Sequence, residues 1–273
     1  MIFAVVPAQN EENRIEIIIS QLFNLPLDRI VVVLNGSTDR TSHKVCKLKS
    51  PRLDVLFFRE SLGIDIPRGV GARYAFFQGA QHVLFVDGDL VGNISSKLRQ
   101  LLVNSHEKNL DLGLINCYPK KGAHSWMTRT LNYYRSLLNK EAGLIDKIGV
   151  SMPSHGPHLV SRRLLKTIPF KELAIPPVEL ALASIKGLNV DIGAEIPHNL
   201  LGSRIKNFHH NRTIVHTIVG DCLEALCLLQ GKPRSRIYNG IEYNGYHHLR
   251  RFDLLANFMP SPGKDINKKA PLS

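Results

Sequence analysis

The sequence predicts an α/β protein with a mainly parallel central sheet and helices on both faces. Strand-like and helix-like segments alternate four times within about the first ninety residues, the pattern expected of a parallel sheet. The strand-like segments are short, continuously apolar runs, which is typical of strands buried on both faces. Small and polar turn residues follow these runs. Loops after successive parallel strands meet at one edge of the sheet, so a ligand site is expected there.

The first half of the chain contains four predicted strands. We expect them at 2–6, 30–34, 55–58 and 82–86, with helices at 15–23, after 41, at 69–78 and at 95–107. Pro7 closes the first strand, since proline cannot continue a central one. Glu11 and Glu12 precede the first helix, where acidic side chains favour the helix dipole.

The alternation is looser in the second half. A strand is expected around Gly113, a helix at 122–140, a loop at 152–158, and a strand and helix ending near 168. Pro177 begins another helix and Gly187 ends it. A strand at 190–196 and a core or amphipathic helix at 214–229 follow. The tail from 233 is basic and aromatic, and its last ten residues are expected to be disordered.

Composition indicates one large globular domain with a C-terminal appendage, because 44% of residues are hydrophobic and 21% charged. The 35 Lys and Arg against 23 Asp and Glu give a net charge of +12, which favours anionic partners: nucleic acid, an acidic membrane surface or phosphorylated substrates. The four cysteines form no CxxC pair and predict reduced thiols in a cytoplasmic protein. We expect no signal peptide and no membrane span.

The strand at 82–86 ends in Asp87-Gly88-Asp89, and this motif dominates the functional prediction. Two carboxylates so close repel each other unless a positive charge lies beside them. A divalent cation that carries a phosphorylated ligand would supply that charge. The alternative is a polar turn that caps the next helix.

The loops after the other three strands carry further candidates. Together the four loops would bind a base, a ribose, a diphosphate and a metal, although helix caps, turn glycines and a solvated arginine would explain each loop alone. The candidates in these three loops are Pro7, Ala8, Asn10 and Glu11; Asn35, Gly36, Ser37 and Asp39; and Arg68, Gly69, Gly71 and Arg73.

Four motifs, VVPAQNEE, VVVLNGSTDRT, RGVGARYA and LFVDGDL, resemble the successive N-terminal motifs of family 2 glycosyltransferases and their relatives with the GT-A fold, among them glucosyl-3-phosphoglycerate and mannosylglycerate synthases. The resemblance covers residues 1–90 clearly and continues faintly to about 205. It implies a GT-A fold with a Rossmann-like sheet. It divides the chain into a nucleotide-sugar-binding half at 1–95, an acceptor-binding half at 96–205 and a C-terminal helical extension with a basic tail at 206–273.

The resemblance also implies roles for single residues. The first loop and Asp39 would surround the nucleotide, and residues 69–73 would approach the diphosphate. Asp89 would bind Mg²⁺ or Mn²⁺, and Asp87 would lie nearer the ribose. The motif departs from many relatives at Leu34, where they have an aspartate, so uridine is only preferred over guanosine.

Later residues are assigned in the same way. Glu179 would act as general base in an inverting enzyme, or orient the acceptor in a retaining one, and a helix-terminal charge is its structural alternative. His198 would complete the metal site with Asp87 and Asp89. Gly156 and His158 belong to a loop expected to line the acceptor pocket, with Arg162 and Arg163 near an anionic acceptor or on the surface.

The implied reaction is metal-dependent transfer of a sugar from a nucleoside-diphosphate sugar to a hydroxyl acceptor, with an anionic or phosphorylated acceptor as one option. The metal, with Arg68 or Arg73, would stabilise the departing diphosphate. We expect a cytoplasmic enzyme with no nucleic-acid partner. A homodimer is left open, as is contact with the inner face of a membrane through the helix around Trp126 and the segment 238–258. The alternative for this basic and aromatic segment is a C-terminal element that closes over an active site.

Three other classes of protein would require different sequence features. A sugar-phosphate nucleotidyltransferase would need a glycine-rich, basic first loop, which PAQNEEN is not. A dehydrogenase would need GxGxxG after the first strand, whereas GVGARY follows the third and lacks the last glycine. A non-enzymatic protein that binds nucleic acid or other anions would use the +12 charge and lose affinity steeply with salt.

Overall fold

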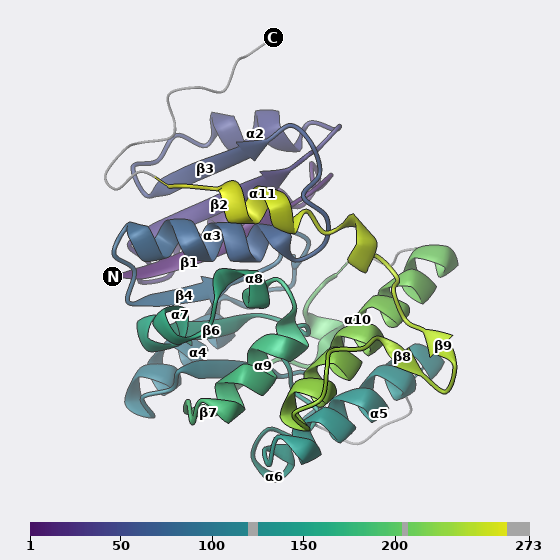
Figure 1. Cartoon of the computed structure of the whole chain (residues 1–273). Coiled ribbons are helices and arrows are strands. Elements are labelled where there is room, and N and C mark those ends of the chain that lie inside the picture. Colours follow the sequence, from purple (N-terminus) through teal and green to yellow (C-terminus); the bar gives the residue numbers. More distant parts are fainter. Residues whose placement is uncertain (120–124, 204–206, 261–273) are drawn as a thin grey trace.

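The computed structural model describes residues 1–119, 125–203 and 207–260. Its main sheet has seven strands in the order β3-β2-β1-β4-β6-β5-β7, with helices on both faces (Figure 1). Strands β1 to β4 pair in parallel, β6 is antiparallel to both of its neighbours, and β5 is parallel to β7. The prediction of a mainly parallel α/β sheet is confirmed.

The strands are β1 (Ile2–Ala8), β2 (Arg29–Asn35), β3 (Leu53–Phe58), β4 (His82–Phe85), β5 (Leu112–Asn116), β6 (His158–Ser161), β7 (Val190–Glu195) and the hairpin β8 (Ile237–Tyr238) with β9 (Ile241–Glu242). The helices are α1 (Ile15–Phe23), α2 (Thr41–Lys47), α3 (Ile66–Phe77), α4 (Ser95–Glu107), α5 (Trp126–Glu141), α6 (Ile145–Ile148), α7 (Arg162–Thr167), α8 (Phe170–Leu173), α9 (Pro176–Ile185), α10 (Phe208–Leu229) and α11 (Phe252–Asn257), with short 3₁₀ turns η1 (His198–Leu200) and η2 (His247–Leu249).

Two apolar layers flank the sheet because successive side chains of a strand point to opposite faces. Phe3 and Val5 of β1 join a core with α3, α5, α9 and α10. Ala4 and Val6 join a second core with α1, α2 and α4. The central strands are therefore buried on both faces, as their continuous apolar runs predict.

The C-terminal region belongs to the same body as the rest of the chain. Val219 of α10 and Leu255 of α11 lie in one apolar cluster with Phe3 of β1. Figure 1 shows α10 beside α5 and α9, and α11 lying across α3. The four cysteines are free, as predicted. The tail expected to be disordered lies outside the described residues. No helix in the described part of the chain is long and apolar enough to cross a membrane.

Candidate active site

A cleft of about 770 Å³ lies at the carboxyl edge of β1, β2 and β4. One wall comes from the loops after the first four strands and the other from α10 and the segment after β9. The predicted residues that line it are Pro7, Ala8, Glu11, Asn35, Arg68, Asp87, Gly88 and Asp89. The structure therefore brings together one or more residues from each of the four predicted loops.

The first and second loops are held to each other by hydrogen bonds. Asn10, which has a positive φ of 56°, accepts a hydrogen bond from the Thr38 amide at 2.8 Å, and its own amide donates to Ser37 Oγ at 3.2 Å. Asp39 accepts from the amides of Glu12, at 3.1 Å, and Thr41, at 2.9 Å. Burial raises the pKa of Asp39, but these hydrogen bonds outweigh it and leave the pKa lowered. Asn10, Ser37 and Asp39 thus shape the loops and do not line the cleft.

Asn35 ties the second loop to the third. Its Oδ1 accepts from the Leu62 amide at 2.6 Å, and its Nδ2 donates to the Gly63 carbonyl at 3.2 Å. Gly36 follows with φ of 62°, and a Cβ there would lie 2.5 Å from the Ser61 nitrogen. Glycine is therefore required at 36 by both conformation and space, and its role is to let the loops approach.

Arg68 and Asp87 form the central ion pair of the cleft. Arg68 Nη2 donates to both Asp87 oxygens, at 2.8 and 2.9 Å, while its Nη1 donates to the Pro153 carbonyl at 3.1 Å. Burial lowers the pKa of Arg68, but the carboxylates of Asp87 and Asp65 outweigh it and raise the pKa. Arg68 stays charged and fixes the orientation of Asp87.

Asp89 is held at the cleft by the turn that precedes it. The Gly88 amide donates to the Pro7 carbonyl at 3.1 Å, and a Cβ on Gly88 would lie 2.9 Å from that oxygen. The motif therefore lies directly against the first loop. Asp89 lines the cleft and is partly exposed, so its carboxylate can reach a ligand.

His198 is not part of a preformed metal cluster. No group of three His, Cys, Asp or Glu side chains that could hold a metal exists among the described residues, which include Asp87, Asp89 and His198. Both oxygens of Asp87 are bound by Arg68, and His198 Nδ1 lies 3.0 Å from His155 Nε2. The three predicted ligands are not assembled into one group, and of the three, Asp87 and Asp89 line the cleft.

Glu179 and His158 are buried away from the cleft. Each side chain is at most 2% exposed, and Glu179 Oε2 lies 3.9 Å from His158 Nε2. His158 also stacks on Phe85 with ring centroids 4.8 Å apart. Burial raises the pKa of Glu179 to about 8, although Arg68 opposes this, and burial holds the pKa of His158 well below its usual value. Neither side chain lines the cleft, so the roles of Glu179 as general base and of His158 in the acceptor pocket stay predictions.

The structure places Gly69, Gly71 and Arg73 of α3 differently from the prediction. The helix begins at Ile66, so Gly69 and Gly71 lie inside it rather than at its start. A Cβ on Gly71 would lie 2.3 Å from Val5 Cγ1, and one on Gly69 would lie 2.7 Å from the Phe170 carbonyl oxygen, so both glycines serve packing. Arg73 donates to the carbonyls of Leu255 and Ala256, at 3.0 and 3.1 Å. None of the three lines the cleft.

Ser154 belongs to the predicted acceptor loop and lines the cleft. Among the described residues of 96–205, no other residue does so. Gly156, with φ of 83°, turns away, and a Cβ there would lie 3.0 Å from Cys117 Sγ. Arg162 donates to the carbonyls of Phe76 and Ala80, and Arg163 donates to Asp111. Neither arginine lines the cleft.

The second wall of the cleft was missed by the sequence analysis. It consists of His210, Ile214, Ile218, Tyr246, His248, Leu249 and Arg251, while Gln9, Ser61, Gly63, Ile64, Asp65 and Pro67 complete the first wall. The spacing of 210, 214 and 218 places the three side chains on one face of a helix, which is the signal that could have found them. Residues 246–251 follow no strand of the main sheet, and their basic and aromatic composition was the one sequence signal that they might cover an active site.

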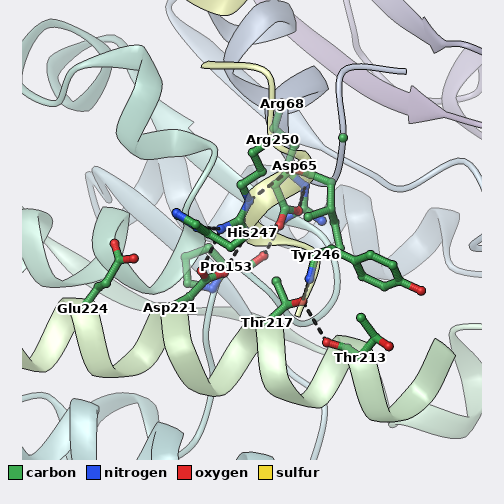
Figure 2. A network of polar contacts seen from close by, with 12 residues as sticks. Asp65, Arg68, Pro153, Thr213, Thr217, Asp221, Glu224, Tyr246, His247 and Arg250 are labelled. Carbon is green, nitrogen blue, oxygen red and sulfur yellow. Dashed lines mark hydrogen bonds and ion pairs between the residues drawn. The ribbon is translucent and has the colours of Figure 1, made fainter. Parts of the chain in front are cut away.

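A buried network of charges fastens the second wall to the first (Figure 2). Arg250 donates to both oxygens of Asp221 on α10, each at 2.7 Å, and to Asp65 at 3.1 Å. Arg236 donates to Asp221 at 2.7 Å and to Glu224 at 2.9 Å. Burial raises the pKa of Asp221, but the two arginines outweigh it and lower the pKa. The network continues through Asp65 to Arg68, at 3.7 Å.

Comparisons with known proteins agree with this arrangement. The family described as Glycosyl transferase family 2 matches residues 3–168. Similar solved structures include glucosyl-3-phosphoglycerate synthase from Mycobacterium tuberculosis with Mn²⁺, UDP and phosphoglyceric acid (TM-score 0.61, 21% identity, 87% of this chain and 81% of that one). The same enzyme with Mn²⁺, UDP-glucose and phosphoglyceric acid gives a TM-score of 0.61 at 19% identity, covering 87% and 82%. With Mg²⁺ and UDP it gives 0.59 at 21%, again covering 87% and 82%. These likenesses confirm the predicted GT-A fold. No curated protein sequence matches the chain.

Proposed function

The chain belongs to glycosyl transferase family 2 and is a glycosyltransferase, and from that premise we propose that its cleft binds a nucleoside-diphosphate sugar, with UDP preferred over GDP, together with Mg²⁺ or Mn²⁺. The sugar is transferred to a hydroxyl acceptor. The observation that carries the proposal is the convergence of Glu11, Asn35, Arg68 and Asp89, from four separate loops, on one cleft. The similar synthase has been solved with UDP-glucose and Mn²⁺, which supports this choice of donor and cation.

The charges of the cleft fit a divalent cation. Four carboxylates line it, those of Glu11, Asp65, Asp87 and Asp89. Arg68 is already paired with Asp87, so a diphosphate entering alone would be repelled. Magnesium is commonly held by one or two carboxylates together with substrate phosphates, so Asp89 and a diphosphate meet the requirement without a three-residue cluster. When bound, the cation would neutralise charge on the departing diphosphate.

The protein's own residues would bind and orient the substrates. The clamped first and second loops hold the nucleotide, with Pro7 and Ala8 against the base and Asn35 fixing the loop opposite. Arg68 holds Asp87 in one orientation, which suits a carboxylate that accepts hydrogen bonds from a ribose. Such fixed positioning lowers the barrier because the reactants need not be ordered in the transition state.

The second wall would bind the acceptor. It lies outside the family-matched residues 3–168 and forms the side of the cleft opposite the loops after the first four strands. Ile214 and Ile218 form an apolar strip on α10, with Leu249 beside them. His210 Nδ1 lies 2.8 Å from the Tyr246 hydroxyl, which adds polar groups at the same wall. Residues 1–95 would then bind the donor, and acceptor binding would extend from residues 96–205 into the segment 206–273.

Contact with a membrane surface is proposed for one exposed aromatic face. Trp126 of α5 is 47% exposed and contacts Phe208, which is 70% exposed, and Tyr133 on the same helix is 55% exposed. Tryptophan and tyrosine favour the membrane interface, and the net charge of +12 favours anionic lipid. This proposal is supported if the protein sediments with anionic vesicles and the W126S variant does not.

Donor binding is tested by thermal shift with UDP- and GDP-sugars, with and without Mn²⁺. We expect a metal-dependent rise in melting temperature with a UDP-sugar, and its loss in Asp89→Asn. The matched control is Asp146→Asn, since Asp146 is exposed on α6 and does not line the cleft. A protein that melts identically in all conditions, or an unchanged shift in D89N, would contradict the proposal.

A further inference from the structure

His247 lies within the buried network of charges that fastens the second wall of the cleft to the first (Figure 2). Its Nδ1 is 3.2 Å from Arg236 Nη1 and 3.1 Å from Arg250 Nη1. A guanidinium can only donate, so Nδ1 carries no proton and accepts from both arginines. The imidazole is therefore neutral, with its proton on Nε2.

The neutral ring completes the hydrogen bonding of Arg250. Arg250 Nη1 divides its two N–H groups between Asp221 Oδ1, at 2.7 Å, and His247 Nδ1. The Arg250 side chain is fully buried, and a buried N–H without an acceptor is costly. His247 thus helps to hold both arginines in the orientation in which they bind Asp221.

A proton on Nδ1 would break these contacts. It would place a third positive charge and another N–H donor against the two guanidinium groups. Burial is the main cause that lowers the pKa of His247, and Arg236 and Arg250 lower it further, while Glu224 and Asp221 oppose this. The protonated ring is therefore incompatible with the network as the structure shows it.

His247 also borders a second cavity, of about 790 Å³, which shares no lining residue with the cleft. Its neighbours in the chain, Tyr246 and His248, line the cleft instead. The second cavity gives a protonated ring space to leave the arginines, and Glu172 and Glu224 supply carboxylates there. The charged residues that line this cavity beside His247 are Arg73, Lys171, Glu172, Glu224, Arg234 and Asp253.

Arg250 and the residue after it hold the second wall against the loop that follows β3. The Arg251 amide donates to the Leu62 carbonyl at 2.9 Å, and Arg250 Nε donates to the Ile64 carbonyl at 3.3 Å. Release of Arg250 from Asp221 would therefore loosen residues 246–251, several of which line the cleft.

We propose that His247 is a positioning residue of the cleft. As a neutral acceptor it holds Arg236 and Arg250 on Asp221, and when protonated it turns into the second cavity and releases the second wall. The inference concerns the order of residues 246–251, and its effect on sugar transfer rests on the proposed function.

The sign of the pH dependence follows from linkage. A released His247 takes up a proton near its ordinary pKa of 6.5, whereas the ring held by the arginines does so only at lower pH. The second wall is therefore fully stable above this value, and its stability falls as the pH falls below it.

The tautomer is tested by long-range ¹H–¹⁵N spectra of the full chain at neutral pH. We expect His247 to carry its proton on Nε2 with Nδ1 unprotonated. A His247 that is protonated on Nδ1 under these conditions would overturn the inference.

The release is tested by hydrogen exchange of the full chain at about pH 7.5 and about pH 5.5, with protection corrected for the intrinsic rates. We expect protection of residues 246–251 to fall about tenfold at the lower pH relative to α1, because hydrogen bonds to charged donors are lost. In His247→Asn, whose Oδ1 can accept but is not protonated, protection should stay high at both values. In His247→Leu it should be low at both.

His43→Asn is the matched control, since His43 is exposed on α2 and lines neither cavity, and it should behave as the wild type does. Protection of 246–251 that does not change with pH in the wild type, or that falls as far in H247N, would overturn the inference. This comparison holds even if H247L fails to fold. The expected exchange in a protein that binds no UDP with Mn²⁺ would support the inference and refute the proposed function.

Discussion

Glu179 shows how burial alters the chemistry available to a carboxyl group. Its side chain is 1% exposed, and burial raises its pKa to about 8 in spite of the nearby Arg68. A pKa raised in this way favours the protonated acid at neutral pH, and a protonated carboxyl group does not accept a proton from an acceptor hydroxyl. The sequence places an acid at the start of a helix but does not reveal that the helix start is covered.

Glu179→Gln should remain active. A general base contributes about 10²- to 10⁴-fold to a rate, whereas we expect E179Q to lose less than tenfold because the glutamine resembles the protonated acid. Steady-state turnover of a UDP-sugar measures this. A thousandfold loss would restore Glu179 as the base.

The same substitution should change how stability depends on pH. The folded state keeps the Glu179 proton up to about pH 8, while the unfolded chain loses it near 4.5, so wild-type stability falls as pH rises across this window. The loss is on the order of a few kcal/mol. Melting curves of E179Q should lack this decline, and its advantage over the wild type should vanish near pH 4.5. Parallel curves for the two proteins would contradict the assignment.

Arg73 is expected to act on the C-terminal segment and not on the nucleotide. In Arg73→Met the carbonyls of Leu255 and Ala256 lose their donor, so amides of α11 should exchange hydrogen faster. The affinity for UDP with Mn²⁺ should change less than about twofold. A tenfold weaker affinity would return Arg73 to the diphosphate site.

At the scale of single elements, the position of α3 depends on glycine, which has no side chain to keep the helix away from the sheet. Gly71 is buried against Val5 of β1, where a Cβ would lie 2.3 Å from Val5 Cγ1. This close approach of helix and strand puts Arg68 one turn before, at the edge where Asp87 emerges. Helix α3 therefore carries the site although its glycines do not touch it.

Gly71→Ala should destabilise the fold by about 1–3 kcal/mol through overpacking. Adding Val5→Ala should recover part of that loss, because the shorter side chain makes room for the new methyl group. Denaturant unfolding of the single and double variants gives the coupling. If the stability losses of the two single variants simply add in the double variant, the new methyl group does not contact Val5, and α3 has instead moved away from β1.

Long elements with a clear period could be predicted from sequence, and short or non-local ones could not. Helices α1 and α4 and strand β5 lie where the apolar pattern placed them. The direction of β6 was not predictable, since periodicity does not reveal which strand is the partner. The turns of α6, α8 and α11 and the β8–β9 hairpin are too short to give a pattern.

The site divides in the same way. The loops of the first wall follow strands that are visible in the sequence, so the sequence could predict that Glu11, Asn35, Arg68 and Asp89 come together. The second wall depends on the tertiary ion pair between Arg250 and Asp221, whose residues are 29 positions apart and carry no motif. Such a pairing is a property of the folded chain alone.

At the scale of the whole molecule, the two walls are held together by buried charges. Asp221 accepts from both Arg236 and Arg250, and its side chain is only 2% exposed. Removing one partner from such a network leaves the remaining charges buried without compensation, which typically costs about 3–5 kcal/mol.

Asp221→Asn should therefore lower the melting temperature and speed hydrogen exchange in residues 246–251, with a parallel loss of turnover as the second wall loosens. Asp253→Asn is the matched control, since Asp253 is 56% exposed in its ion pair with Arg251, and its melting temperature should barely change. A D221N protein as stable as the wild type would show that the network does not secure the wall.

The ion pair between Arg250 and Asp65 connects residues that are 185 positions apart in the chain. During synthesis from the N-terminus, the nucleotide loops leave the ribosome long before the segment that completes their cleft. The nascent chain thus carries a half-built binding surface, with Asp65 and Arg68 awaiting a neighbour not yet translated. The cleft would be completed only once residues 246–251 have been translated.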